Sequence, residues 1–478
     1  MQHIIRFPEI ILKGVVCMRI SKGLISVVSM ASAMLLLCSC TVYDLGLSEG
    51  QIEKVISQIE NEAQFSSVTA SSEENAETPS SVAAASFSEA PKETGGNSNS
   101  ENTAEESEIS DNDNALINPD IFEREPVPEE PALPETGFTN IHKITNADDL
   151  NQFANAVMCG HSYAGEQVTL EADIDLAGTE WTPIGVRGRA FKGEFIGNGH
   201  TISNLTITSL TDKMTDARGY EACVGFFGYA EDAVIRGITL ENINISIPKR
   251  NNAESLYVGA VAGSMFAVNR GIEISECKAT GNISVSSDDL VFAMTGGIVG
   301  GFDANYKGTY YRMSLLYSAV NIAVKGETVT CGGITGILNS RNSKPTDSYV
   351  TDIVYIGSID EANVGCSYTG GLCGIYNSAY RCDIKNAFIN LEIKRTQLGP
   401  YTFIGIVSGD QCVATGDLGL ENVYGMITCN GKNMKMSMLG RKNGNVYFKN
   451  CTEADRLPDD VSFNAEKWDL SDRALPKP

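Results

Sequence analysis

The chain has 478 residues, of which 60 are acidic and 36 basic, so its formal net charge is −24. This balance argues against a nucleic-acid partner, which requires a basic face, and against docking of the folded part on anionic lipid. Residues 1–40 hold 4 bases and 1 acid (net +3), residues 41–136 hold 3 and 22 (net −19), and the remaining 342 hold 29 and 37 (net −8). Four histidines occur, at positions 3, 142, 161 and 200, and none belongs to a His-Glu-x-x-His motif, which excludes a zincin site. We expect neither a cofactor nor a metal ion.

The first 40 residues have the organisation of a secretory signal peptide. An apolar run of 14 residues, 24–37, follows Arg19 and Lys22. The run is too short to span a bilayer, which takes about 20 residues, and a basic start before an apolar middle is typical of an export signal. Residues 1–17 only lengthen the basic region, so we expect translation to begin at Met18 rather than Met1.

The apolar run ends in Leu37-Cys38-Ser39-Cys40, which resembles the lipobox of bacterial lipoproteins. The resemblance implies that Cys40 becomes the mature N-terminus and carries diacylglycerol, which would anchor the protein to the cell membrane, exposed outside the cytoplasm. Cys38 fits less well, because Leu37 before it is large for the cleavage pocket. The alternative is an ordinary signal peptide with incidental cysteines.

Residues 41–136 are expected to form a disordered acidic tether. The segment consists mainly of Ser, Glu, Ala, Asn and Pro, and it buries too little apolar surface to offset chain entropy. Prolines near its end should make that part stiffer and more extended. The spacing of Ile52, Val55, Ile56 and Ile59 predicts one short amphipathic helix within it. Such a tether would hold a folded unit away from the membrane.

The folded part, residues 137–455, should open with a capping helix. Thr145 can cap it, while Leu150, Phe153, Ala154 and Val157 mark one apolar face, and Gly160 can end it. Residues 168–176 then alternate in polarity like a strand.

A short motif that begins and ends in glycine, with mostly apolar residues between, recurs through the rest of this region with a period near 36. We call it the glycine mark; Gly225-Phe226-Phe227-Gly228 is the first example. The final glycines of the six marks step by 35, 37, 36, 38 and 35, and they are Gly228, Gly263, Gly300, Gly336, Gly374 and Gly409. A second mark follows each by 17 to 23 residues and ends in an aliphatic side chain: Ile245, Ile283, Ile322, Ile359, Leu391 and Ile427. Self-similarity at a fixed period is the signature of a solenoid.

The repeats predict an all-β fold. Their short segments alternate with period 2 and lack the long apolar stripes of a helical solenoid. We therefore expect a continuous β-solenoid in which the glycine marks turn corners with positive φ, followed by a C-terminal cap or tail at 456–478.

The segments Trp181-Thr182-Pro183-Ile184-Gly185 and 191–205, together with the glycine marks, resemble bacterial surface proteins with GLUG repeats. The resemblance covers about residues 140–455 and implies a right-handed parallel β-helix of the pectate-lyase type. Some such proteins accompany IgA-specific metalloproteases, but that peptidase domain is absent from this sequence. The chain departs from the pattern at Leu316 and Val354, where an Asn-Cys pair is expected.

Several residues could have a chemical role, but a structural role is favoured. Asp173 and Asp175 could bind calcium, but two carboxylates alone make a weak site, so a solvated strand face is the favoured explanation. His200 could act as a base, yet no acid or nucleophile pairs with it by motif, so a turn role is favoured. The cysteines, among them Cys223, Cys277, Cys331, Cys373 and Cys429, could be buried thiols or a disulfide ladder, and we leave both open.

Function is therefore sought in binding. Aromatic side chains are typical interface anchors, and the candidates are Tyr306, Tyr310, Tyr311, Tyr376 and Tyr380. The favoured hypothesis is a lipid-anchored surface adhesin or binding module for a glycan or a protein. The alternative is a surface polysaccharide lyase or hydrolase of β-helix fold. No catalytic residue can be assigned to it, because no carboxylates cluster at the same position of successive repeats.

Overall fold

The computed structural model describes residues 140–477, except for gaps at 177–178, 218, 249–252, 288–291, 305, 307, 327, 341–346, 363, 365, 379–381, 396–400, 413–416, 435–436, 460–462 and 464–467. The signal peptide, Met18, Cys40, the tether and Tyr380 lie outside the described residues. Among the described residues, no helix has the length and apolar character needed to cross a membrane.

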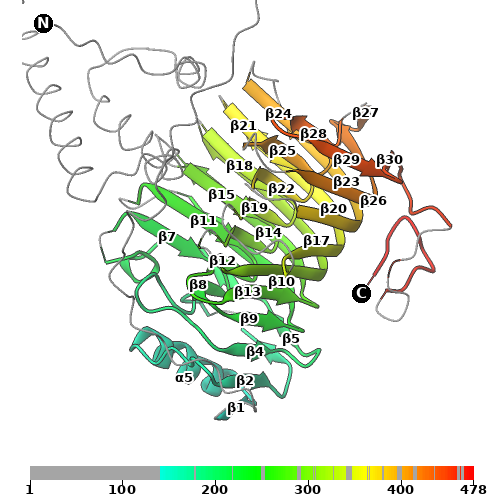
Figure 1. The fold of residues 1–478 in the computed structure, drawn as a ribbon. Helices are drawn as coiled ribbons and strands as arrows, with labels where there is room; N and C mark the ends of the chain where they lie inside the picture. The colour runs from blue at the N-terminus through cyan, green and yellow to red at the C-terminus, as the bar shows by residue number, and fades with distance from the viewer. Residues whose placement is uncertain are drawn as a thin grey trace, which may run out of the picture. The chain divides into compact units, whose positions relative to one another are not determined.

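The described chain winds into stacked coils that form a parallel β-solenoid, which confirms the predicted fold class. Figure 1 shows the coils rising from the helix near the start of the array to the last strands. The array opens with β1 (Ile141–Ile144), α5 (Ala147–Met158), β2 (Gln167–Leu170), β3 (Ile174–Asp175), β4 (Glu194–Ile196), β5 (Thr201–Ser203), β6 (Thr206–Ile207) and the short 3₁₀ helix η2 (Asp212–Met214).

Three sheets run along the array, because each coil contributes a strand to each. The six-stranded sheet contains β7 (Glu221–Val224), β11 (Ser255–Gly259), β15 (Phe292–Gly296), β18 (Thr328–Gly332), β21 (Cys366–Gly370) and β24 (Tyr401–Gly405). The seven-stranded sheet contains β8 (Phe227–Glu231), β12 (Ala262–Phe266), β16 (Val299–Asp303), β19 (Thr335–Asn339), β22 (Cys373–Asn377), β25 (Ser408–Gln411) and β28 (Leu439–Arg441).

The third sheet, called here the large sheet, also takes in β1 to β6. Its further strands are β9 (Val234–Arg236), β10 (Thr239–Ile247), β13 (Gly271–Ser275), β14 (Lys278–Ser287), β17 (Tyr310–Gly326), β20 (Tyr349–Ala362), β23 (Cys382–Arg395), β26 (Leu418–Cys429), β27 (Lys432–Met434), β29 (Val446–Lys449) and β30 (Thr452–Glu453). Neighbouring coils pair in parallel, and only the β26–β27 pair of named strands is antiparallel in the described part.

The capping helix lies where the sequence predicts it, with a shift at its start. Leu150, Phe153, Ala154 and Val157 are its buried residues. The N-cap, however, is Asn146 rather than Thr145, because the Asn146 side chain accepts hydrogen bonds from the backbone N–H groups of the first turn. The Thr145 hydroxyl instead donates to Asp149, at 2.6 Å.

All six second marks are buried in the core, and four of them form one column along the large sheet. Ile245, Ile283, Ile322 and Ile359 are buried and pair with one another in register along the large sheet. In the next coil Ile393 takes this position, and Leu391 pairs with Gly357 instead. The aliphatic column is therefore continuous, because a parallel sheet stacks equivalent residues directly above one another.

The glycine marks are not corners, which corrects the expectation drawn from the sequence. Each is the second residue of a strand of the seven-stranded sheet, and none has a positive φ. They are glycines because neighbouring backbone comes too close. A Cβ on Gly300 would lie 2.4 Å from the Val258 backbone nitrogen, and one on Gly409 would lie 2.2 Å from that of Thr369.

The left-handed corners lie on the large sheet instead. They follow one another from coil to coil as Gly237, Glu276, Leu315, Asp352, Asn386, Asn422 and Asn450, all with φ between 50° and 68°. Asn tolerates this conformation better than most residues. Its amide also links the coils, since Asn386 donates to Asp352 at 3.2 Å and Asn422 donates to Asn386 at 3.0 Å.

The C-terminal segment packs against the side of the array. Val354, Phe388 and Tyr424 are in register on adjacent strands and form a hydrophobic cluster separate from the inner core. Leu457, Phe463 and Trp468 from the tail are buried in this same cluster. The tail therefore covers the part of the large sheet formed by Val354, Phe388 and Tyr424.

Candidate functional site

The predicted tyrosines divide between surface and core. Tyr306 is 37% exposed and its ring contacts Phe266 edge-on at 5.9 Å, while Tyr310 is partly exposed at the start of β17. Tyr311 and Tyr376 are only 2% and 1% exposed, which corrects the expectation that they face a ligand. Neighbouring residues of a strand point to opposite faces of the sheet. Because Tyr310 points outward, Tyr311 points into the core.

Tyr310 forms a surface cluster with residues from two neighbouring coils. The Arg312 guanidinium lies 4.5 Å from the centre of the Tyr310 ring and 5.8 Å from that of Tyr349, which is 39% exposed. Arg312 pairs in register with Tyr349 on one side and with Glu273 on the other. We call Tyr310, Arg312, Tyr349 and Glu273 the tyrosine–arginine patch.

Local chain geometry makes room for this patch. A Cβ on Gly271 would lie 2.7 Å from two carbons of the Tyr310 ring, so the ring rests on a residue that has no side chain. Glu273 lies 3.6 Å from Arg312 and 3.7 Å from Arg236, and Arg236 reaches Glu194 at 2.7 Å. The patch therefore continues along the sheet as a row of alternating charge.

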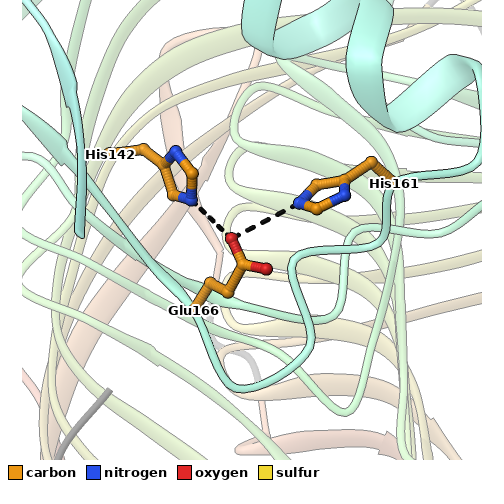
Figure 2. A group of neighbouring side chains, drawn as sticks. All are labelled: His142, His161 and Glu166. Atoms are coloured by element: carbon orange, nitrogen blue, oxygen red, sulfur yellow. Dashed lines mark hydrogen bonds and ion pairs between the residues drawn. The ribbon is translucent and has the colours of Figure 1, made fainter. Parts of the chain in front are cut away.

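A second cluster lies at the first coil, where two histidines converge on one carboxylate. Figure 2 shows His142 and His161 pointing from opposite sides toward Glu166. His161 Nε2 lies 3.3 Å from Glu166 Oε2, and His142 Nε2 forms a closer contact with the same oxygen. The Glu166 side chain is 14% exposed, against 41% and 51% for His142 and His161. Glu166 is therefore mostly enclosed, with the imidazoles on the solvent side.

Three separate segments bring this cluster together. His142 lies in β1, His161 follows α5, and Glu166 immediately precedes β2, which pairs in parallel with β1. A tight turn from Tyr163 to Glu166 is closed by a backbone hydrogen bond of 3.0 Å, and Tyr163 adopts φ 60°. These contacts aim the Glu166 side chain at the two rings.

Tyr163 supports the cluster from within. Its ring packs edge-on against both imidazoles, with centroid separations of 5.0 Å to His142 and 4.2 Å to His161. Burial, together with the nearby Glu166 charge, raises the pKa of the Tyr163 hydroxyl, so this group stays neutral near pH 7.

No spacing motif in the sequence reveals the histidine cluster. His142 and Glu166 are 24 residues apart, and their approach depends on the β1–β2 register. The small number of histidines is the one signal that the sequence carries, since few remain outside the N-terminal region.

Asp173, Asp175 and His200 bond between coils. Asp173 Oδ1 lies 3.1 Å from His200 Nδ1 and accepts from the Thr201 backbone at 2.9 Å, whereas Asp175 accepts from the Asn204 amide at 2.7 Å. Hydrogen bonds from Thr201 and His200 lower the pKa of Asp173. His200 thus has an acidic partner, which the preceding coil supplies and no local motif shows.

None of the described cysteines forms a disulfide, and Cys223, Cys277, Cys331, Cys373 and Cys382 are buried. Burial raises the pKa of the Cys277 and Cys373 thiols to about 12. Thiols with such values are inert side chains of the core rather than nucleophiles.

No protein-family model matches the chain, and no curated protein matches it in sequence. Among solved structures, the chain is similar to one from Bacteroides ovatus described as a "putative immunoglobulin A1 protease", with 19% identity and a TM-score of 0.44. The match covers 70% of this chain and 91% of that one.

Proposed function

We propose that this chain is a lipid-anchored protein of the bacterial cell surface whose solenoid binds an extracellular glycan. The lipobox-like segment ending in Cys40 supports the anchor, and the resemblance to GLUG-repeat surface proteins supports the display role. The observation that carries the binding proposal is the tyrosine–arginine patch, where two aromatic rings flank one guanidinium on an open sheet face.

The chemistry of the patch fits a sugar chain. Aromatic rings offer apolar contact, and the arginine fork supplies several N–H donors for hydroxyl or carboxylate groups. Ser275, Ser314 and Thr351 lie two residues beyond Glu273, Arg312 and Tyr349, and they pair in register beside the patch. Since coils repeat about every 4.8 Å, an extended polymer along the axis meets polar groups at each step.

Hydrolysis is the second candidate, because glycosidases use two carboxylates. Glu194 and Glu273 do lie on this face, but Arg236 forms ion pairs with both. A general acid must be free to donate a proton to the leaving group, and carboxylates engaged by one guanidinium suit that role poorly. Binding is therefore the better-supported activity.

Removing the aromatic rings of the patch should abolish glycan binding. A panel of polysaccharides first identifies one that the wild-type chain binds. We expect the double variant Tyr310→Ala/Tyr349→Ala to bind this polysaccharide at least tenfold more weakly, because the contact area of both rings is removed. Tyr220→Ala is the matched control, since Tyr220 is 53% exposed outside this patch. Affinity electrophoresis measures the change.

The same panel decides between the two functions. If the wild-type chain released new reducing ends or unsaturated products from any polysaccharide of the panel, its function would be enzymatic cleavage rather than binding. If the double variant bound the polysaccharide as tightly as Tyr220→Ala, the tyrosine–arginine patch would not be the binding site.

The anchor is tested separately. Wild-type cells should yield a mature chain that begins at a diacylated Cys40 and partitions with the membrane fraction, whereas Cys40→Ala should abolish both. Mass spectrometry of the mature N-terminus measures this. An unmodified, released product that begins at another residue would contradict the anchor.

A further inference from the structure

We propose that His142, His161 and Glu166 form a Zn²⁺ site at the first coil of the solenoid. The site is independent of the tyrosine–arginine patch, which lies on other strands. It offers two imidazole nitrogens and one carboxylate oxygen, and these three ligand atoms lie within 4.8 Å of one another.

The separations suit a tetrahedral ion. Zinc lies about 2.0–2.1 Å from imidazole nitrogen and about 2.0–2.2 Å from carboxylate oxygen, so one nitrogen and one oxygen ligand at the tetrahedral angle are about 3.3–3.5 Å apart. The measured separation between His161 Nε2 and Glu166 Oε2 is 3.3 Å. The closer contact of His142 must open slightly, and His142 has room because its side chain is 41% exposed.

The donor set selects the metal. Mg²⁺ and Ca²⁺ take oxygen ligands, whereas imidazole suits zinc and its neighbours in the transition series. Two histidines and one glutamate also form a known type of three-ligand zinc set, with the fourth position open to water. Here that position faces solvent, because both imidazoles are about half exposed.

The ion would join three segments of the first coil that are separate along the chain. His142 belongs to β1, which among the described strands pairs only with β2, while His161 lies just after the capping helix. Zn²⁺ would therefore tie β1, the end of α5 and the start of β2 together. The edge of a solenoid is its exposed end, so this tie would protect the first coil from opening.

Zinc titration of the purified full-length chain in detergent, after chelator treatment, tests the proposal. We expect calorimetry to show a site of one equivalent that His142→Gln and His161→Gln each weaken at least tenfold. His200→Gln should leave it unchanged, because that imidazole pairs with Asp173. The melting temperature should rise with Zn²⁺ in the wild type and in His200→Gln, since an ion that binds only the folded state stabilises it.

Two controls separate this site from misfolding of the variants and from zinc bound by thiols. Melting in excess chelator should be the same for all variants, which shows that they fold alike. Co²⁺ should give d–d absorption without a thiolate charge-transfer band. Such a band would assign the metal to cysteine thiolates and overturn the proposal. Undiminished zinc uptake by the His142→Gln/His161→Gln double variant, or no uptake by the wild type, would also overturn it.

Discussion

Replacing Arg395 with methionine should destabilise the solenoid by about 3–5 kcal/mol at neutral pH, because it leaves the Glu361 carboxylate buried without its partner. Both side chains lie inside the array, at 2% and 0% exposure, and they form an ion pair between adjacent strands of the large sheet. Arg395 also donates to Ser367 at 3.0 Å and to Thr402 at 2.9 Å. Urea denaturation of the purified chain measures the loss.

The cost should shrink in acid. Burial raises the pKa of Glu361 and the Arg395 charge opposes that rise, so the pKa rises further when the arginine is removed. An acid whose folded pKa lies above its unfolded value contributes stability at low pH that is lost as pH rises through the folded pKa. The deficit of Arg395→Met should therefore be smaller at pH 5 than at pH 7.

Lys394→Met is the matched control for this ion pair. Lys394 lies on the same strand, but its pair with Glu392 at 3.6 Å is about half exposed, so the loss should stay below about 1 kcal/mol. Replacing both buried partners, as Glu361→Leu/Arg395→Met, should recover most of the stability, because no charge is then left unpaired. Equal losses for Arg395→Met and Lys394→Met would show that burial of the pair carries no energetic weight.

Gly300→Val, at a glycine mark in the middle of the array, should strongly destabilise the solenoid. A Cβ there would lie 2.4 Å from the Val258 nitrogen and 2.6 Å from the Gly263 oxygen, both backbone atoms of the preceding coil. Backbone cannot move aside as a flexible side chain can, so the coils must separate, and we expect a loss of about 3 kcal/mol or more, at the upper end of the cost of overpacking a core. Thermal melting followed by circular dichroism measures it.

Gly431→Asn provides the contrast for Gly300. Gly431 has φ +74° with nothing within 4 Å of an added Cβ, and Asn accepts a left-handed backbone at little cost. Its melting temperature should stay close to that of the wild type. If Gly300→Val melted equally high, the close approach between coils would not limit the packing of this array.

The period and the polarity pattern alone determined the fold class of this protein. A fixed step of 35 to 38 residues between glycines requires equivalent residues to stack, and the β-type alternation decides which side chains face inward. The apolar face of the capping helix could be predicted in the same way, because Leu150, Phe153 and Val157 follow the helical period. These are local or periodic signals, which the chain carries without reference to its partners in space.

What only the tertiary structure decided is which residues meet across coils. The glycine marks proved to be close approaches rather than corners, because the distance between strands and not the local turn excludes a Cβ at Gly300. Tyr311 and Tyr376 proved to be core residues, since strand register sets which face each enters. His142, His161 and Glu166 come together only through the pairing of β1 with β2 and the exit of α5. In a parallel solenoid, residues that contact each other across coils are about one repeat apart in the sequence. A short sequence motif cannot reveal contacts over that separation.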